Sequence, residues 1–357
     1  MNSTNSNKPA AVIGIDLAKR HLDVVGYDED KKMVLRLPRI SYKKLCEKLA
    51  NMPRAVVLME ACGGSHNFVR RVKALGHDAR LVNPGDVKRI RSGHQKNNML
   101  DAGYIAWTHF MPETSYVAAK TQAQQDLQSL QRIYQGYAKT RVEYGNRIHA
   151  LLLEYGIHSV ASRQFFAKDL PGCLEDHSED LSPLIMQAIL ELRDGWIKAL
   201  EREESAGKRY DDLVKASEDA KRLMTIPGIG VKGAGALIAH CGDPRRFRDS
   251  RQFAASIGLV PRQNSTGDRD TLGHITKRGP KHLRSVLVQG AGAVLMHADR
   301  LDGALGDWVR KIKASGKKYG VKVCAVAAKL ARIAWRILSE KSAAYKPQAI
   351  RPVISAA

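Results

Sequence analysis

The stretch Val12-Ile13-Gly14-Ile15-Asp16 decides the fold, because it is a short apolar run that ends in a carboxylate. Leu22-Asp23-Val24-Val25 resumes the apolar pattern after a polar turn, and Ala55-Val56-Val57-Leu58 is a second buried-strand candidate, followed by the acid Glu60. Helical spacing and a further strand follow, at Asn67–Leu75 and Asp78–Val82. This alternation of strands and helices predicts an α/β domain, which we place at residues 10–119.

A helical region follows the α/β domain. From Thr121 onward the apolar residues recur at intervals of three and four, which predicts a long helix with a coiled-coil seam. A second helix is expected from Leu181, so residues 120–218 are predicted to form a helical arm or a dimerisation device. A plain helical hairpin packed on its own domain is the alternative. A mostly helical third unit is expected over residues 219–345, ending in the basic helix Val321–Leu338. The predicted fold class is α/β plus α.

Positive charge is the strongest signal in the composition. The chain has 357 residues, with 58 Lys and Arg against 36 Asp and Glu, and a formal net charge of +22. Residues 216–357 carry 26 basic and 10 acidic side chains, so +16 of that charge lies there. Such an excess indicates a polyanion partner, and charge alone does not distinguish DNA from RNA. The alternative is a soluble basic surface, or a ribosome-type binder without chemistry.

Cysteine usage and the apolar pattern restrict the class of protein. The five cysteines are an odd number with no close pairing, which argues against a disulfide framework and a structural zinc site. The longest apolar stretch, Val286–Met296, is too short to cross a bilayer, and residues 1–9 lack a signal-peptide core. We therefore expect a cytoplasmic protein with no membrane partner.

Three acids lie at the ends of predicted elements. Asp16 and Glu60 each close a strand, and Asp101 opens a helix expected over Asp101–Phe110. Strand C-termini and helix N-termini gather at one edge of an α/β sheet, so these acids can converge. Clustered carboxylates repel each other unless a cation lies between them, and oxygen ligands select Mg²⁺ or Mn²⁺. The alternative is that the acids are helix caps or surface groups.

A glycine-rich turn at Ile226-Pro227-Gly228-Ile229-Gly230 is typical of a helix-hairpin-helix. Gly228 and Gly230 would let the backbone approach a phosphate, and the following helix, which carries Lys232, would point its free N–H groups at it. Such a grip on a nucleic-acid backbone is independent of sequence. The alternative is a plain turn between two packed helices.

A hydroxyl-bearing segment follows at Ser265-Thr266-Gly267. We expect it to be a loop, flanked by the basic residues Arg262, Lys277, Arg278 and Arg284. Cationic donors of this kind would stabilise the charge that builds on phosphoryl oxygens under attack, and a serine ester would conserve the phosphodiester energy without ATP. The alternative is a simple hydrogen-bonding turn.

Together these motifs resemble the bacterial DEDD-type insertion-sequence transposases related to the Piv/MooV invertases. In the first half the matching motifs are Gly14–Lys19, Met59–Gly63, Val82-Asn83-Pro84, Lys96-Asn97 and Asp101-Ala102. In the second half they are Ile226–Gly230, Gly258–Gln263 and Ser265-Thr266-Gly267. The resemblance covers nearly the whole chain, from about Val12 to about Leu338, and the combination is specific although each motif alone is not.

The resemblance implies a RuvC-like (RNase H-like) first domain, a coiled-coil linker and a compact helical C-terminal domain that carries a nucleophilic serine. It implies bridge-RNA-guided recombination of DNA, a Mg²⁺ cofactor, location at the bacterial nucleoid, and an oligomer from dimer to tetramer in which the acidic site of one subunit is completed by the serine of another. The residues assigned on this basis are Asp16, Glu60 and Asp101 for Mg²⁺ with Asn98 as auxiliary ligand, Ser265 as nucleophile, and Arg262, Lys277, Arg278 and Arg284 for phosphate.

Two departures from the family pattern affect these assignments. Asn98 stands where the family has an acid, so an amide oxygen is present without its charge and metal affinity or activity is expected to fall. The hydroxyl directly before Gly267 belongs to Thr266, and we favour Ser265 because serine is the less hindered nucleophile. If neither acts, this copy is a decayed element.

Three other functions remain open at this point. A RuvC-type metal-dependent nuclease or junction resolvase would use water instead of serine. A site-specific invertase of the same family would use the same chemistry on differently arranged sites. A non-catalytic nucleic-acid-binding protein would keep its function without Asp16.

Overall fold

The computed structural model describes residues 8–90, 97–112, 114–266 and 269–346, and the motif residues Lys96 and Gly267 lie outside these ranges. The chain divides into two compact units, Met1–Ala123 and Gln124–Ala357. A mixed α/β first unit and a mostly helical C-terminal region confirm the expected fold class in outline.

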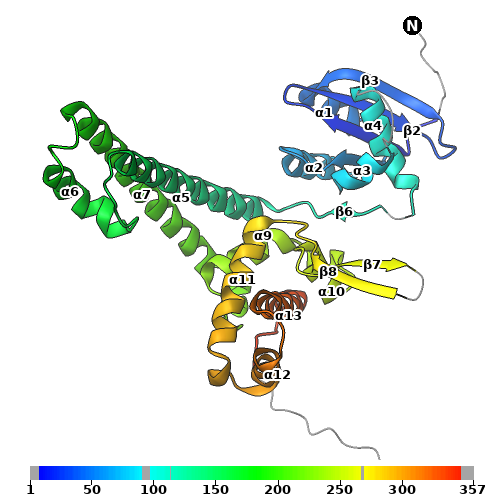
Figure 1. The fold of residues 1–357 in the computed structure, drawn as a ribbon. Helices are drawn as coiled ribbons and strands as arrows, with labels where there is room; N and C mark the ends of the chain where they lie inside the picture. Colours follow the sequence, from blue (N-terminus) through cyan, green and yellow to red (C-terminus); the bar gives the residue numbers. More distant parts are fainter. Residues whose placement is uncertain (1–7, 91–96, 113, 267–268, 347–357) are drawn as a thin grey trace, which may run out of the picture. The chain divides into compact units, whose positions relative to one another are not determined.

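A six-stranded mixed sheet forms the centre of the first unit (Figure 1). Its order is β3-β2-β1-β4-β5-β6, and the strands are β1 (Val12–Leu17), β2 (His21–Tyr27), β3 (Met33–Ser41), β4 (Val56–Glu60), β5 (Asp78–Val82) and β6 (Tyr116–Val117). β4 pairs parallel with both β1 and β5, and the remaining strand pairs are antiparallel. The strands predicted from the apolar runs are confirmed, whereas β3 and β6 were not anticipated.

Helices cover both faces of the sheet because successive strand residues point to opposite sides. Ile13, Ile15 and Met59 pack in one core cluster with α1 (Tyr42–Ala50) and α2 (Ser65–Ala74). The other face packs against α3 (Pro84–Ile90) and α4 (Asn98–Trp107), and its cluster includes Val12, Leu58, Val82, Ala102 and Ile105. A 3-10 turn, Thr108–Phe110, follows α4.

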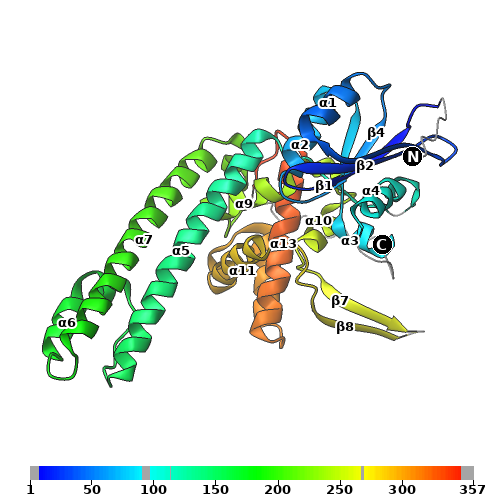
Figure 2. The ribbon, with the colours of Figure 1, turned by 90° about the horizontal axis from the view of Figure 1, so that it is seen from above.

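Two long helices form the arm of the second unit. α5 (Gln122–Glu154) and α7 (Pro183–Lys215) have 33 residues each and run side by side in opposite directions (Figures 1 and 2). A short π-helical turn, Phe165–Asp169, and α6 (Leu170–Asp176) close the far end around a core that contains Trp196. Arg141 Nε donates to Glu203 Oε2 across the pair at 2.6 Å. The expected long helices are confirmed.

The C-terminal helices pack around α13 (Tyr319–Ser339), which contributes much of their core. The other elements are α8 (Glu218–Leu223), α9 (Val231–Cys241), a 3-10 turn (Pro244–Arg246), α10 (Ser250–Ser256), α11 (Lys281–Met296), a second 3-10 turn (Ala298–Arg300) and α12 (Gly303–Ala314). A two-stranded hairpin of β7 (Pro261–Thr266) and β8 (Arg269–Ile275) extends from them (Figure 2). Among the described residues, no helix is both long and apolar enough to span a bilayer.

Candidate functional site

Two carboxylates lie side by side at the C-terminal ends of adjacent parallel strands. Ile15 of β1 pairs with Met59 of β4, so Asp16 and Glu60 are the next residues on strands about 4.8 Å apart. Side chains alternate along a strand, which places both acids on the face of Val12 and Leu58. This is the face that α4 covers, so the sequence-based expectation that these two acids converge agrees with the register.

Helix α4 approaches this face at a glycine. A Cβ built on Gly14 would lie 2.1 Å from the carbonyl oxygen of Ala102 and 2.5 Å from the amide nitrogen of Ala106, so only glycine admits the helix here. Tyr27, which pairs with Val12 at the start of β1, packs edge-to-face against Trp107 with ring centroids 5.8 Å apart. The C-terminal end of α4 therefore lies over the start of β1, and its N-terminal end lies toward Asp16.

The first turn of α4 carries the other two predicted ligands. The helix begins at Asn98 and not at Asp101, because Asn97 Oδ1 accepts the Met99 N–H at 3.0 Å and caps it. Asp101 lies in the first turn, where the helix dipole favours an acid, and is half-buried, whereas Asn98 is exposed. The predicted span Asp101–Phe110 was wrong by one turn at its start, because Asn97, a residue type that favours helix N-caps, begins the helix earlier.

The structure also adds an acid that the sequence reasoning missed. Asp23 of β2 pairs directly with Asp16 of β1 and is 6% exposed. Its Oδ1 accepts the Arg39 N–H of β3 at 3.0 Å, at a position where Arg39 has a φ of +48°. The sequence feature that could have indicated Asp23 is an acid placed among the apolar residues Leu22, Val24 and Val25. Through this hydrogen bond the Asp23 carboxylate ties the edge strand β3 to β2, which is the strand next to that of Asp16.

Electrostatic effects tie the two strand-end acids to one region. Partial burial, followed by the charges of Glu60 and then Asp16, raises the pKa of the Cys62 thiol. Within the described ranges, however, no three or more His, Cys, Asp or Glu side chains are grouped closely enough to hold a metal ion. The structure therefore brings Asp16 and Glu60 together and places Asp101 on the adjoining helix, without a closed three-ligand cluster. All of these donors are oxygens, which suits Mg²⁺.

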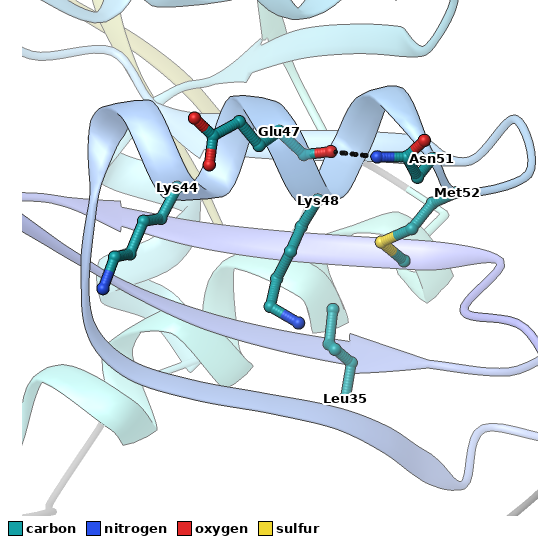
Figure 3. Close-up of a pocket in the computed structure, with 6 residues that line it drawn as sticks. All are labelled: Leu35, Lys44, Glu47, Lys48, Asn51 and Met52. Carbon is teal, nitrogen blue, oxygen red and sulfur yellow. Dashed lines mark hydrogen bonds between the residues drawn. The ribbon is translucent and has the colours of Figure 1, made fainter.

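A surface depression of about 650 Å³ lies on the other face of the sheet (Figure 3). It lies between α1 and β3 and is lined by Leu35, Lys44, Glu47, Lys48, Asn51 and Met52. Because α1 covers the face opposite to α4, this depression is separate from the acids.

The glycine-rich turn joins α8 to α9 as expected, and Gly228 packs closely against α11. Its φ is +79°, and an added Cβ would lie 2.7 Å from the carbonyl oxygen of Gly290 in α11. A Cβ on Gly290 would in turn lie 2.0 Å from the carbonyl oxygen of Gly228. Glycine at 228 therefore permits backbone packing on α11. Gly230 is exposed like Gly228, but an added Cβ there would meet nothing within 4 Å.

The Lys232 side chain, which is 38% exposed, contacts other helices of the second unit. Its Nζ lies 4.4 Å from the ring centroid of Tyr134 and 5.0 Å from that of Tyr210. It also lies 2.8 Å from Asp211 Oδ1. The ammonium group thus joins α5, α7 and α9, and the phosphate contact of Lys232 stays a prediction.

Ser265 and Thr266, which were expected in a loop, belong to strand β7. Ser265 lies in β7, where it is exposed, and Gln263 Nε2 donates to its Oγ at 3.0 Å. The expectation of a loop was wrong for Ser265, because β7 pairs antiparallel with β8 and Ser265 lies opposite Asp270. Arg262 on the same strand is also exposed. The Thr266 side chain lies outside the described ones, so the choice of nucleophile stays a prediction.

Backbone contacts fix the base of this hairpin. Gly258 has a φ of +77°, and an added Cβ would lie 2.3 Å from the carbonyl oxygen of Arg278. Arg284 Nη1 donates to the carbonyl oxygens of Ile257 and Arg278, at 3.0 and 2.9 Å. Arg284 therefore holds the hairpin base, while the side chains of Lys277 and Arg278 are exposed and available to a phosphate.

Comparison with protein-family models gives two matches. Residues 13–157 match the DEDD-type IS110 model, whose description is "Transposase". Residues 220–304 match the model described as "Transposase IS116/IS110/IS902 family". The first match contains all four predicted metal ligands, and the second contains Ser265.

Curated relatives are similar over most of the chain. The transposase for insertion sequence element IS1328 of Yersinia enterocolitica is 35% identical over 329 residues, covering 92% of this chain and 97% of the relative. The transposase for IS1111A of Coxiella burnetii is 33% identical, covering 94% and 92%. A pilin gene-inverting protein of Moraxella bovis is 30% identical over 125 residues, covering 34% and 37%.

Proposed function

The chain belongs to the IS110 family of insertion-sequence transposases, and from this premise we propose that it is an RNA-guided DNA recombinase that exchanges strands through a covalent phosphoserine. The acids of β1 and β4 and the serine of β7 act on one scissile phosphodiester. The observation that carries the proposal is the position of Asp16 and Glu60, which directly follow the paired residues Ile15 and Met59 of adjacent parallel strands, on the face covered by the helix of Asp101.

Mg²⁺ is the cofactor that this oxygen donor set fits, and Mn²⁺ fits the same ligands. Asp16, Glu60 and Asp101 would hold the ion, and Asn98 would add an amide oxygen. An ion held there would supply positive charge against the phosphate under attack. The chain itself keeps two carboxylates on neighbouring strands, where their mutual repulsion favours a cation between them.

Ser265 is the proposed nucleophile. Its Oγ forms a bond to phosphorus while the bond from phosphorus to the leaving strand oxygen breaks, and the proton lost by the hydroxyl is balanced by the one that the leaving oxygen gains. A hydroxyl of the incoming strand then attacks the phosphoserine and releases Ser265 with its proton restored. Gln263 Nε2 positions the Oγ by donating to it at 3.0 Å. Arg262, Lys277 and Arg278 would contact phosphate oxygens.

Partners and assembly form part of the same proposal. The net charge of +22 supports DNA and a guide RNA as partners at the nucleoid. Helix α5 exposes Val142 and Leu153 by 49% and 56% on one side, about three turns apart, which supports contacts between arms in a dimer or tetramer. In that assembly the serine of one subunit completes the acidic site of another. The RuvC-like domain, coiled-coil arm and transposase domain would correspond to residues 10–119, 120–218 and 219–345.

An invertase is the second candidate, supported by the similarity to pilin gene-inverting proteins over about a third of the chain. It would use the same residues, with the two DNA sites on one molecule. A RuvC-like nuclease or junction resolvase would use the acids alone and water as the nucleophile.

A denaturing gel tests the proposal. The full chain is mixed with Mg²⁺, the RNA transcribed from the end of its own element, and labelled DNA of that end. We expect a covalent protein–DNA band that Ser265→Ala abolishes and Thr266→Ala retains. Asp16→Asn is expected to remove both cleavage and the band. Cleavage by Ser265→Ala without any adduct would establish the nuclease alternative and overturn the serine mechanism.

A further inference from the structure

Helices α12 and α13 carry an uninterrupted run of positive charge. From Trp308 to Ser339 the sequence contains nine Lys and Arg and no Asp or Glu. This run lies beyond residue 304, where the second family match ends. Lysines gather most densely at the connection between the two helices, where Lys311, Lys317 and Lys318 are exposed.

The contacts of this connection bring further positive charge together. Lys322 Nζ donates to the carbonyl oxygen of Lys313 at 2.6 Å, which holds the start of α13 against the end of α12. In the described part of the chain, the carboxylate paired with these lysines is that of Asp299, 2.7 Å from Lys313 Nζ. The Asp299 carboxylate is 72% exposed, so water and salt weaken this pair. Lys318 is the N-cap of α13, and no acid lies in its first turn.

An exposed aromatic ring lies among these lysines. Tyr319 is 64% exposed, and its Oη lies 3.4 Å from a Cβ built on Gly292, so the side chain extends along α11. Met296, one turn farther along α11, is 68% exposed, and Val321 is 53% exposed. We call Lys311, Lys317, Lys318 and Tyr319 the α12–α13 patch.

We propose that the α12–α13 patch binds an unpaired segment of RNA, with the lysines on its phosphates and a base stacked on Tyr319. Lysines alone would suit any polyanion, including duplex DNA. An exposed tyrosine adds a stacking surface that only an unpaired base can use, since paired bases are stacked within their helix. Unpaired loops and ends are where RNA commonly offers its bases to aromatic side chains. The proposal rests on the nucleic-acid function above and is independent of the serine chemistry.

Fluorescence anisotropy of the full chain tests the patch. The probe is a labelled unpaired RNA of about 12 nucleotides, with a duplex DNA of the same length for comparison. Tyr319→Ala is expected to weaken RNA binding between about 5-fold and 150-fold and leave duplex DNA binding unchanged, whereas Tyr319→Phe keeps RNA binding. Lys317→Gln with Lys318→Gln is expected to reduce the slope of log affinity against log salt by about 1.4 on the RNA.

Matched controls and a second readout keep the test decisive. Tyr155→Ala and Lys168→Gln remove an exposed aromatic and an exposed cation from the arm, and neither is expected to change RNA binding. Ultraviolet crosslinking of the bound RNA should label the tryptic peptide Tyr319–Lys322. Equal loss of RNA and duplex binding in Tyr319→Ala would identify a duplex contact and overturn the proposal. Unchanged RNA affinity in that variant, with no crosslink at the peptide, would also overturn it. Neither result bears on whether Ser265 forms an adduct.

Discussion

Gly14→Ala is the most direct test of how α4 positions the acidic site. The added methyl group would lie 2.1 Å from the Ala102 oxygen and 2.5 Å from the Ala106 nitrogen, and both atoms belong to helix backbone that cannot rotate away. Carbon approaches closer than 3.0 Å are essentially never observed, so α4 must shift by about 1 Å. Asp101 and Asn98, in the first turn of that helix, must shift with it.

Two consequences of that shift can be measured. Overpacking of this kind costs about 1–3 kcal/mol, which corresponds to a fall of about 4–12 °C in the unfolding midpoint of a unit of this size. A displacement of about 1 Å in a group that holds the reacting centre can cost about 100-fold in rate. Calorimetry measures the first effect, and Mg²⁺-dependent DNA cleavage, assayed well below the midpoint, measures the second.

Gly63→Ala is the matched control, because an added Cβ there meets nothing within 4 Å. It is expected to leave both the midpoint and cleavage unchanged. If Gly14→Ala unfolds at the same temperature as Gly63→Ala and cleaves at the parent rate, the close approach of α4 to β1 is refuted. A lower midpoint with full cleavage would separate Asp101 from the catalytic site.

Three further predictions concern the second unit. Lys232→Met is expected to lower the free energy of unfolding, measured in urea, by about 1 kcal/mol, because Asp211 loses its ion-pair partner. Unchanged stability with a smaller slope of log DNA affinity against log salt would instead indicate a phosphate contact. Gln263→Ala is expected to slow adduct formation by about 10-fold in single-turnover assays without weakening DNA binding, and parent rates would exclude a positioning role toward Ser265. Burial raises the pKa of the Cys241 thiol to about 12 from 9.0, so its contribution to stability is complete below pH 9 and is lost as the pH rises toward 12. Urea midpoints of Cys241→Ala should therefore fall less steeply above pH 9 than those of the parent, and parallel slopes would contradict the burial of this thiol.

The central strands and the strand-end acids could be predicted from sequence because their signals are local. β1 and β4 are apolar runs followed by acids, and parallel pairing alone brings Asp16 and Glu60 together. β3 was missed because Arg36, Pro38 and Arg39 interrupt its pattern at the edge of the sheet, where a strand needs little burial. The two-residue β6 is too short to leave a pattern.

The roles of single residues in the second unit depended on distant parts of the chain. The sequence suggested phosphate contacts for Gly228 and Lys232. In the structure Gly228 packs against α11, and Lys232 contacts tyrosines of α5 and α7. Contacts between residues about 60 or 100 positions apart leave no periodic signal. Asp23 was overlooked for a different reason, since an acid within an apolar strand reads as a surface position until the pairing with Asp16 is known.

The equal lengths of α5 and α7 restrict how the arm can change during evolution. Each helix has 33 residues, which corresponds to about 50 Å along the axis. Because the two helices run in opposite directions, an insertion in only one of them would shift its residues relative to their partners on the other helix. Contacts across the pair such as the Arg141–Glu203 hydrogen bond would then be lost. Relatives with longer or shorter arms should therefore carry insertions or deletions of equal length in both helices, each close to a whole number of helical turns. The length of the arm then sets a fixed distance between its two ends.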